Sequence, residues 1–125
     1  MANPNIVNVS AIYANTHFLT PANTAPQVLL SNAASSGLVY KINNIIAANV
    51  DGTNAVDATV TINSAASGGG TAFPIISTVS VPADASLIVV DKTTAIYLME
   101  NQSILVTSGT SSKIAYTISY ESLAS

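Results

Sequence analysis

Residues 113–121 read Lys-Ile-Ala-Tyr-Thr-Ile-Ser-Tyr-Glu, and this stretch decides the fold class. Every second position holds a large apolar or aromatic side chain: Ile114, Tyr116, Ile118 and Tyr120. A period of two places these four side chains on one face of an extended chain. The pattern predicts an antiparallel strand with one face against a core and the other face in solvent.

The same period recurs over most of the chain. It predicts further strands at residues 7–13, 28–30, 38–50, 57–63, 73–81, 87–90 and 104–106. In the longest of these, one face is predicted to carry Leu38, Tyr40, Ile42, Ile46, Ala48 and Val50, interrupted by Asn44. Residues 87–90, Leu-Ile-Val-Val, form a continuous apolar run that is typical of a central strand buried on both faces.

Turn residues separate these strands. Asp51-Gly52, Pro82-Ala83-Asp84, residues 108–112 and the glycine-rich residues 64–71 are predicted loops. Residues 16–26 contain Pro21 and Pro26 and are predicted to be an extended connection. No stretch predicts a helix, because the helical spacing near residues 27–34 is short and lies between Pro26 and Gly37.

The sequence therefore predicts an all-β, single-domain antiparallel β-sandwich, jelly-roll or Ig-like, of about eight strands. The domain is expected to span residues 1–125, with an extended N-terminal segment and no internal repeat. The side chains expected to be mostly buried are Ile42, Ile46, Val60, Ile62, Val79, Val81, Leu87, Val89, Ile104, Val106, Ile114, Tyr116 and Ile118. Core packing is also the expected role of most of the five tyrosines.

Charged side chains are scarce. Among 125 residues there are six acidic residues and three of Lys and Arg together, so charged residues make up 7% of the chain. About 25% is ordinary for a globular domain. Since the cores of protein interfaces are depleted in charge, this composition favours a surface that is largely covered by partners.

The composition also excludes several classes of protein. Three lysines and no arginine cannot neutralise many phosphates, so direct nucleic-acid binding is not expected. The chain has no cysteine, which excludes a disulfide scaffold and a zinc module. Residues 1–5 show no secretion signal, and no apolar run is long enough to span a membrane.

No catalytic constellation is predicted. His17 is the single histidine and lies in the predicted connection, without the partners of a catalytic triad. The glycines at 68–70 lack the lysine and the strand-to-helix context of a phosphate loop.

Two groups of acidic residues were weighed as sites. Asp51, Asn54 and Asp57 follow one another at intervals of three, and their oxygens could in principle bind a cation. The calcium-loop pattern of an EF-hand is absent, and the same residues are typical of turns, so this question stays open from sequence. Asp84, Asp91 and Glu100 flank turns, but the chain has no tryptophan and few aromatics to line a sugar cleft. No catalytic, cofactor-binding or metal-binding residue is therefore predicted, and no cofactor.

The arrangement of strands and turns resembles a known class of proteins. The residues that carry the likeness are 46–54 (Ile-Ala-Ala-Asn-Val-Asp-Gly-Thr-Asn), 79–92, 96–104 and 118–121. Over residues 38–121 the chain resembles small all-β virion structural proteins of tailed bacteriophages, of the cyanophage and marine-phage type.

That resemblance implies a non-enzymatic structural protein of the virion, assembled in the host cytoplasm. It favours a capsid decoration (cement) protein that clamps the assembled shell. The expected partners are the major capsid protein or other virion proteins, and a homo-oligomer, dimer or trimer, without direct nucleic-acid or membrane contact. Residues 1–15, or the connection at 16–26, are expected to provide part of the grip. Two alternatives stay open: a small neck or tail accessory protein, and a host-surface binding module.

Overall fold

The chain folds into strands joined by tight loops. The structure, a computed structural model, describes residues 5–124. The described residues form these elements: β1 (Ala11–Leu19), β2 (Gln27–Asn32), β3 (Leu38–Asn49), β4 (Val56–Asn63), β5 (Ala72–Val81), β6 (Ser86–Val90), the 3-10 turn η1 (Lys92–Thr94), β7 (Ile96–Leu98), β8 (Gln102–Ser108) and β9 (Ile114–Ala124).

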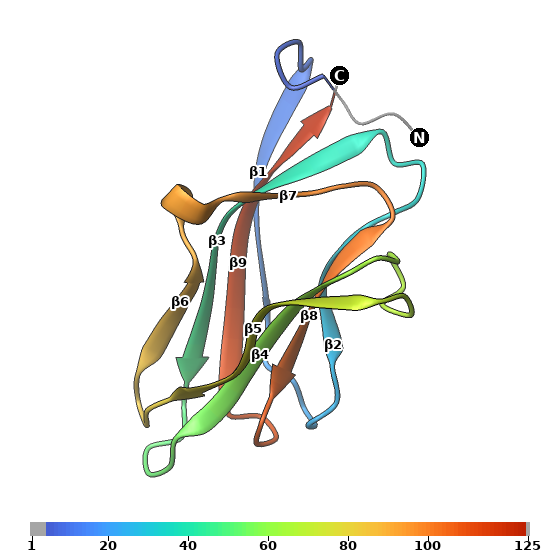
Figure 1. Cartoon of the computed structure of the whole chain (residues 1–125). Helices are drawn as coiled ribbons and strands as arrows, with labels where there is room; N and C mark the ends of the chain where they lie inside the picture. The colour runs from blue at the N-terminus through green and yellow to red at the C-terminus, as the bar shows by residue number, and fades with distance from the viewer. Residues whose placement is uncertain (1–4, 125) are drawn as a thin grey trace.

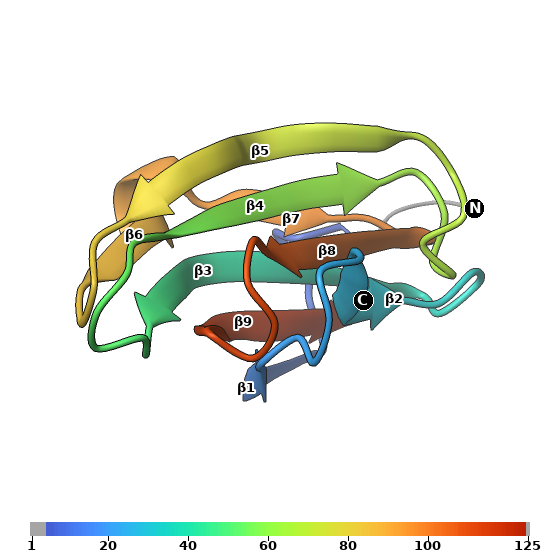
Figure 2. The same cartoon turned by 90° about the horizontal axis from the view of Figure 1, so that it is seen from below.

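The strands build two antiparallel sheets that face each other (Figure 1). One sheet has the order β1-β9-β3-β6, with β7 also paired to β3, and the other has the order β2-β8-β4-β5. Seen from below, the two sheets form separate layers (Figure 2). Eight strands that alternate between two sheets in this order form a jelly roll, which confirms the predicted sandwich and selects the jelly roll over the Ig-like form.

The core lies between the two layers. Its fully buried side chains include Tyr116, Ile42, Ile45, Leu98 and Ile104. Eight of the expected core residues are buried: Ile42, Val60, Val81, Ile104, Val106, Ile114, Tyr116 and Ile118. Ile62, Val79, Leu87 and Val89 are only half-buried, since they lie on β4, β5 and β6 at or near the edges of the sheets.

The face predicted for the second half of β3 is wrong. The register between β3 and β9 shifts between Ile42 and Asn44, so that Asn43 is an extra, bulged residue. Beyond the bulge, Ile45 and Ala47 are fully buried, whereas Ile46 and Ala48 face outward. Strict alternation from Ile42 predicted the opposite, because one inserted residue reverses the face of every residue after it.

The central strand was also assigned to the wrong segment. Residues 87–90 belong to β6, which is an edge strand, and Ile88 is 63% exposed. The strand buried on both faces is β8, in which residues 103–106 are all buried. The loop at 64–71 folds over its outer side, where a Cβ on Gly68 would meet the Leu105 side chain at 3.2 Å.

The N-terminal strand begins later than predicted. β1 starts at Ala11 and continues to Leu19, so it takes in the first part of the segment expected to be a connection. Val7 lies before the strand and is 86% exposed. Of the residues expected to provide grip, 1–4 lie outside the described residues. Tyr116 and Tyr120 are buried as expected, but Tyr13 and Tyr97 are exposed.

Candidate interaction surface

The outer face of the β1-β9-β3-β6 sheet is a broad surface with almost no charge. Cross-strand partners share a face, so the register identifies which side chains point away from the core. At least partly exposed on this outer face are Ile12, Ala14, Thr16, Phe18, Lys41, Asn44, Ile46, Ala48, Ser86, Ile88, Tyr97, Ala115, Thr117, Ser119 and Glu121. Only Lys41 and Glu121 are charged, and they are direct cross-strand partners of opposite sign.

A row of three large apolar side chains and one threonine crosses β1, β9, β3 and β6 on this face. Phe18 on β1 pairs with Thr117 on β9, Thr117 pairs with Ile46 on β3, and Ile46 pairs with Ile88 on β6. Phe18 is 78% exposed. Such large exposed side chains in one row are typical of a surface that contacts another protein.

A hollow of about 440 Å³ lies at the β6 end of the row. Its walls are Ile46, Ile88, the bulged Asn43 and residues 91–93, which include the charged side chains Asp91 and Lys92 at the start of η1. Asn44 also lines the hollow, and within residues 5–124 its side-chain oxygen Oδ1 is buried without a hydrogen-bond partner. A buried acceptor in this state is satisfied when a partner supplies a donor.

The β1 strand forms an open edge of the same sheet. It pairs with β9 in continuous register from Ala11 to Leu19, with no bulge, and no further strand within residues 5–124 pairs with its other side. Residues 12–18 are all exposed, and none of them is Lys, Arg, Asp, Glu or Pro. Natural sheets usually protect an edge with charge, proline or a bulge. The β1 edge has none of these protections.

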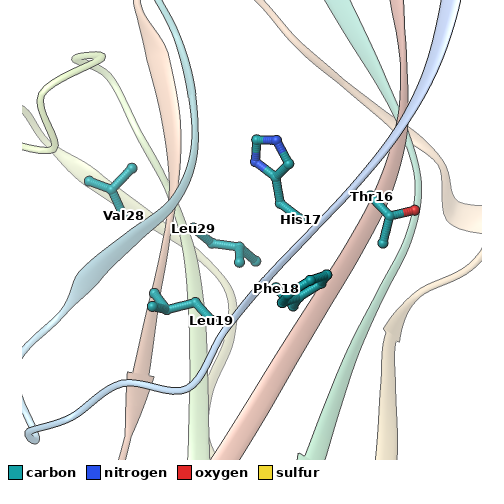
Figure 3. A pocket seen from close by; sticks show the side chains of 6 residues that line it. All are labelled: Thr16, His17, Phe18, Leu19, Val28 and Leu29. Carbon is teal, nitrogen blue, oxygen red and sulfur yellow. The ribbon is translucent and has the colours of Figure 1, made fainter.

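His17 lies on β1 beside a shallow pocket of about 270 Å³ between β1 and β2 (Figure 3). The pocket is lined by Thr16, His17, Phe18, Leu19, Val28 and Leu29. The His17 ring lies edge-on to Tyr120, with Nε2 3.2 Å from the Tyr120 hydroxyl oxygen. Burial, with a smaller effect of Tyr40, raises the pKa of Tyr120. This pair supports the β1–β9 packing, and no carboxylate lines the pocket.

The predicted acidic cluster is organised as a turn. Oδ1 of Asp51 accepts hydrogen bonds from the backbone N–H of Thr53 at 2.8 Å and of Asn54 at 3.0 Å. These bonds, that from Thr53 above all, hold the pKa of Asp51 below its usual value. Asp57 lies on β4, where its carbonyl accepts from Gly109. Among the described residues, no three acidic or metal-ligating side chains gather closely enough to hold a metal ion.

The second candidate group, Asp84, Asp91 and Glu100, has separate surroundings. Asp91 caps η1 by accepting from the hydroxyl and the backbone N–H of Thr93, and these bonds lower its pKa. Asp84 lies in the β5–β6 turn with φ of 56°. Both carboxylate oxygens of Glu100 are buried without a hydrogen-bond partner in residues 5–124. The structure therefore does not bring the three carboxylates to one site.

Sequence reasoning missed the interaction surface for one physical reason. The outer face is assembled from five strands, most of them distant in sequence, and the β3 bulge decides that Ile46 belongs to it. The sequence signal for this surface is the uncharged run from Ala11 to Leu19. Alternation alone does not show that this strand lies at the edge of a sheet.

Comparison with known proteins identifies the fold. No family model and no curated protein matches the chain. Among solved structures, the chain is similar to a subunit of Bacillus endospore appendages, described as a family of disulfide-linked pili. The two share 12% identity with a TM-score of 0.52, over 91% of this chain and 89% of that one.

The chain is also similar to part of a viral protein. A chain of the T13 viral particle of IBDV matches with 6% identity and a TM-score of 0.52. The match covers 93% of this chain and 32% of the viral chain, so this protein spans about a third of that length. Likeness at such identities shows a shared jelly-roll fold. In residues 5–124, no helix has the length and apolar character needed to cross a membrane.

Proposed function

We propose that this protein is a non-enzymatic structural subunit that coats a protein shell, as a capsid decoration (cement) protein does. The observation that carries the proposal is the outer face of the β1-β9-β3-β6 sheet, with fifteen exposed or half-exposed side chains and one charge of each sign. Depletion of charge at the centre of a surface is the compositional mark of an interface. The fold shared with a chain of a viral particle supports this proposal.

The mechanism is stabilisation by binding. A rigid jelly roll that lies flat across the joint between two shell subunits buries surface on both of them. A protein that binds only the assembled shell stabilises that shell by mass action. The hollow beside Ile46 and Ile88 would receive an apolar side chain of the shell.

Co-sedimentation tests this proposal with empty shells assembled from the capsid protein that is encoded together with the chain. The parent protein should pellet with the shells and not bind unassembled capsid protein. Ile88→Glu places a charge in the apolar row at a site that is 63% exposed, so it should lose shell binding while remaining folded. Phe73→Glu, at a 57% exposed site on β5 of the other sheet, is the matched control.

The results separate the alternatives. Equal shell binding by Ile88→Glu and the parent would overturn the role of the outer face. Copy number per particle, measured by quantitative mass spectrometry, addresses the neck or tail alternative. A number that follows the capsid subunits supports decoration, whereas a number that matches a single ring supports a neck or tail accessory protein.

A filament subunit is the second candidate. It is favoured by the match to the endospore pilus subunit, which covers nine-tenths of both chains. That pilus is described as disulfide-linked, whereas this chain has no cysteine, so any filament of it would be held without disulfide bonds. Electron microscopy of the purified chain decides between the two: a filament subunit polymerises alone, and a decoration protein does not.

A further inference from the structure

We infer that two copies of this chain pair along their β1 edges, antiparallel and around a two-fold axis at Asn15. The two β1-β9-β3-β6 sheets then join into one continuous sheet across the dimer. The inference concerns contacts between copies and does not depend on the proposed role on a shell.

The first reason is that the β1 edge is the one suited to pairing. β1 is nine residues long and keeps an unbroken register with β9. The opposite sheet ends at β5, which contains Pro74, a positive φ of 47° at Thr78 and two shifts of register. β6 has five residues, and β2 has six with a register shift at Leu29. Among the strands of residues 5–124, only β1 offers a long row of unpaired backbone groups that no proline, bulge or register shift interrupts.

The second reason is that β1 is complementary to itself. In an antiparallel pair centred on Asn15, each residue meets the one equally far on the other side of Asn15. Ile12 then faces Phe18 of the second copy on the outer face, and these side chains are 56% and 78% exposed in the single chain. On the outer face Ala14 also meets Thr16 of the second copy, and on the opposite face of the sheet Tyr13 meets His17. Large side chains meet large ones and small meet small, with no charge at any position.

The third reason concerns the backbone at the edge. The N–H and carbonyl groups of successive β1 residues alternate between the β9 side and the open side, so every second residue has both groups available to a partner strand. Pairing of two strands joins these groups in a ladder of N–H to carbonyl bonds along about 30 Å of strand. A two-fold pairing also uses both edges at once, so the assembly closes as a dimer rather than growing into a fibre.

One strand on each side makes a small interface. The area is below the roughly 800 Å² per partner of standard complexes, so the dimer is expected to be weak and in rapid exchange. A molar mass that rises from monomer to dimer with concentration in sedimentation equilibrium is the expected result for the parent protein. A constant monomer mass at every concentration up to the solubility limit would overturn the inference.

Charge swapping at the axis tests the geometry. Asn15→Lys places two lysines opposite each other, and Asn15→Asp places two aspartates there, so each variant alone should dimerise at least about tenfold more weakly than the parent. A mixture of the two variants should regain dimers, because the opposite charges then meet. Ser77→Lys, which puts the same charge on the exposed β5 edge, should dimerise like the parent. Dimers of Asn15→Lys alone that match the parent, or a mixture that stays monomeric, would contradict pairing at Asn15.

A single cysteine tests the register independently of affinity. The chain has none of its own, so Asn15→Cys introduces the only thiol. Directly opposed strand residues have Cα atoms about 4.5–5.5 Å apart, within the range of a disulfide. Mild oxidation should therefore link Asn15→Cys into a covalent dimer and leave Ser77→Cys largely unlinked. Equal linking of both variants would show random collision and would overturn the inferred register.

Discussion

Asn32, Asn49 and Asn63 are the last residues of β2, β3 and β4, and each is at most 3% exposed. Each uses its side-chain amide where the backbone ladder ends. Asn49 donates to the carbonyls of Asn54 at 3.0 Å and Val81 at 2.9 Å, and its oxygen accepts from the backbone of Asp51 at 2.8 Å. At the scale of single residues, buried amides fix the loops that follow these three strands.

Replacing Asn49 tests this role. Asn49→Ala leaves a backbone N–H and two carbonyls without these partners, so the free energy of unfolding should fall by about 1–3 kcal/mol. Asn54→Ala is the matched control, because Asn54 contributes its backbone carbonyl to the bond with Asn49. Urea denaturation measures both variants. Equal stability of the two would show that the Asn49 amide does not hold the loop.

Tyr116 gives the protein a dependence on alkaline pH. Burial raises its pKa to about 12, from 10 in the unfolded chain. Below pH 10 the hydroxyl is neutral in both states and the stability is complete. Between pH 10 and 12 the unfolded chain loses the proton first, so the free energy of unfolding falls, by up to about 2–3 kcal/mol.

Denaturation at pH 9 and near pH 11.5 measures this loss. Tyr116→Phe should be less stable at pH 9, because the hydroxyl donates to the Thr107 carbonyl in the parent, but it should lose less stability on the change to high pH. If the free energy of unfolding of the parent and of Tyr116→Phe fell equally between these two pH values, Tyr116 would not be the source of the alkaline sensitivity.

At the scale of elements, alternation alone identified most strands and failed where a strand is irregular or at an edge. The regular β9 was predicted within a few residues and with the correct buried face. The β3 bulge at Asn43 could not be foreseen, because the chain shows no glycine or proline there and the extra residue is fixed by pairing with β9. The apolar run of β6 predicts a central strand, which is wrong because composition shows how hydrophobic a strand is and not its place in a sheet.

The neighbouring residues Ile45 and Ile46 test the bulge directly. Ile45 is fully buried, so Ile45→Ala should lower the free energy of unfolding by about 2–5 kcal/mol. Ile46 faces outward, so Ile46→Ala should cost less than about 1 kcal/mol. Chemical denaturation of the two variants compares identical substitutions one residue apart. A larger loss of stability for Ile46→Ala than for Ile45→Ala would contradict the bulge at Asn43.

The candidate surface shows the same limit of sequence reasoning. The low charge of the chain indicated a covered surface, and the structure gathers uncharged side chains on one sheet face. Which residues form it depended on the register of five strands, and the row from Phe18 to Ile88 joins residues seventy positions apart. Local pattern cannot supply such long-range pairing.

At the scale of the whole molecule, the chain has only nine charged side chains for a solvent-accessible surface of 6242 Å². Contacts made by such a surface rest on apolar burial and backbone hydrogen bonds rather than on ion pairs. Raising the salt from about 0.1 M to 1 M shortens the Debye length from about 10 Å to 3 Å. Shell binding and dimerisation should both persist or strengthen under this change. Co-sedimentation and sedimentation equilibrium at the two salt concentrations measure this, and release by salt would indicate an electrostatic interface instead.

The orientation of the protein on a particle tests the central claim most directly. Cryo-electron microscopy of particles that contain the chain should show jelly-roll density on the shell, with Phe18, Ile46 and Ile88 of the outer face against the capsid subunits. Density in which the outer face of the β1-β9-β3-β6 sheet is open to solvent, or particles whose shell lacks the chain, would contradict the account.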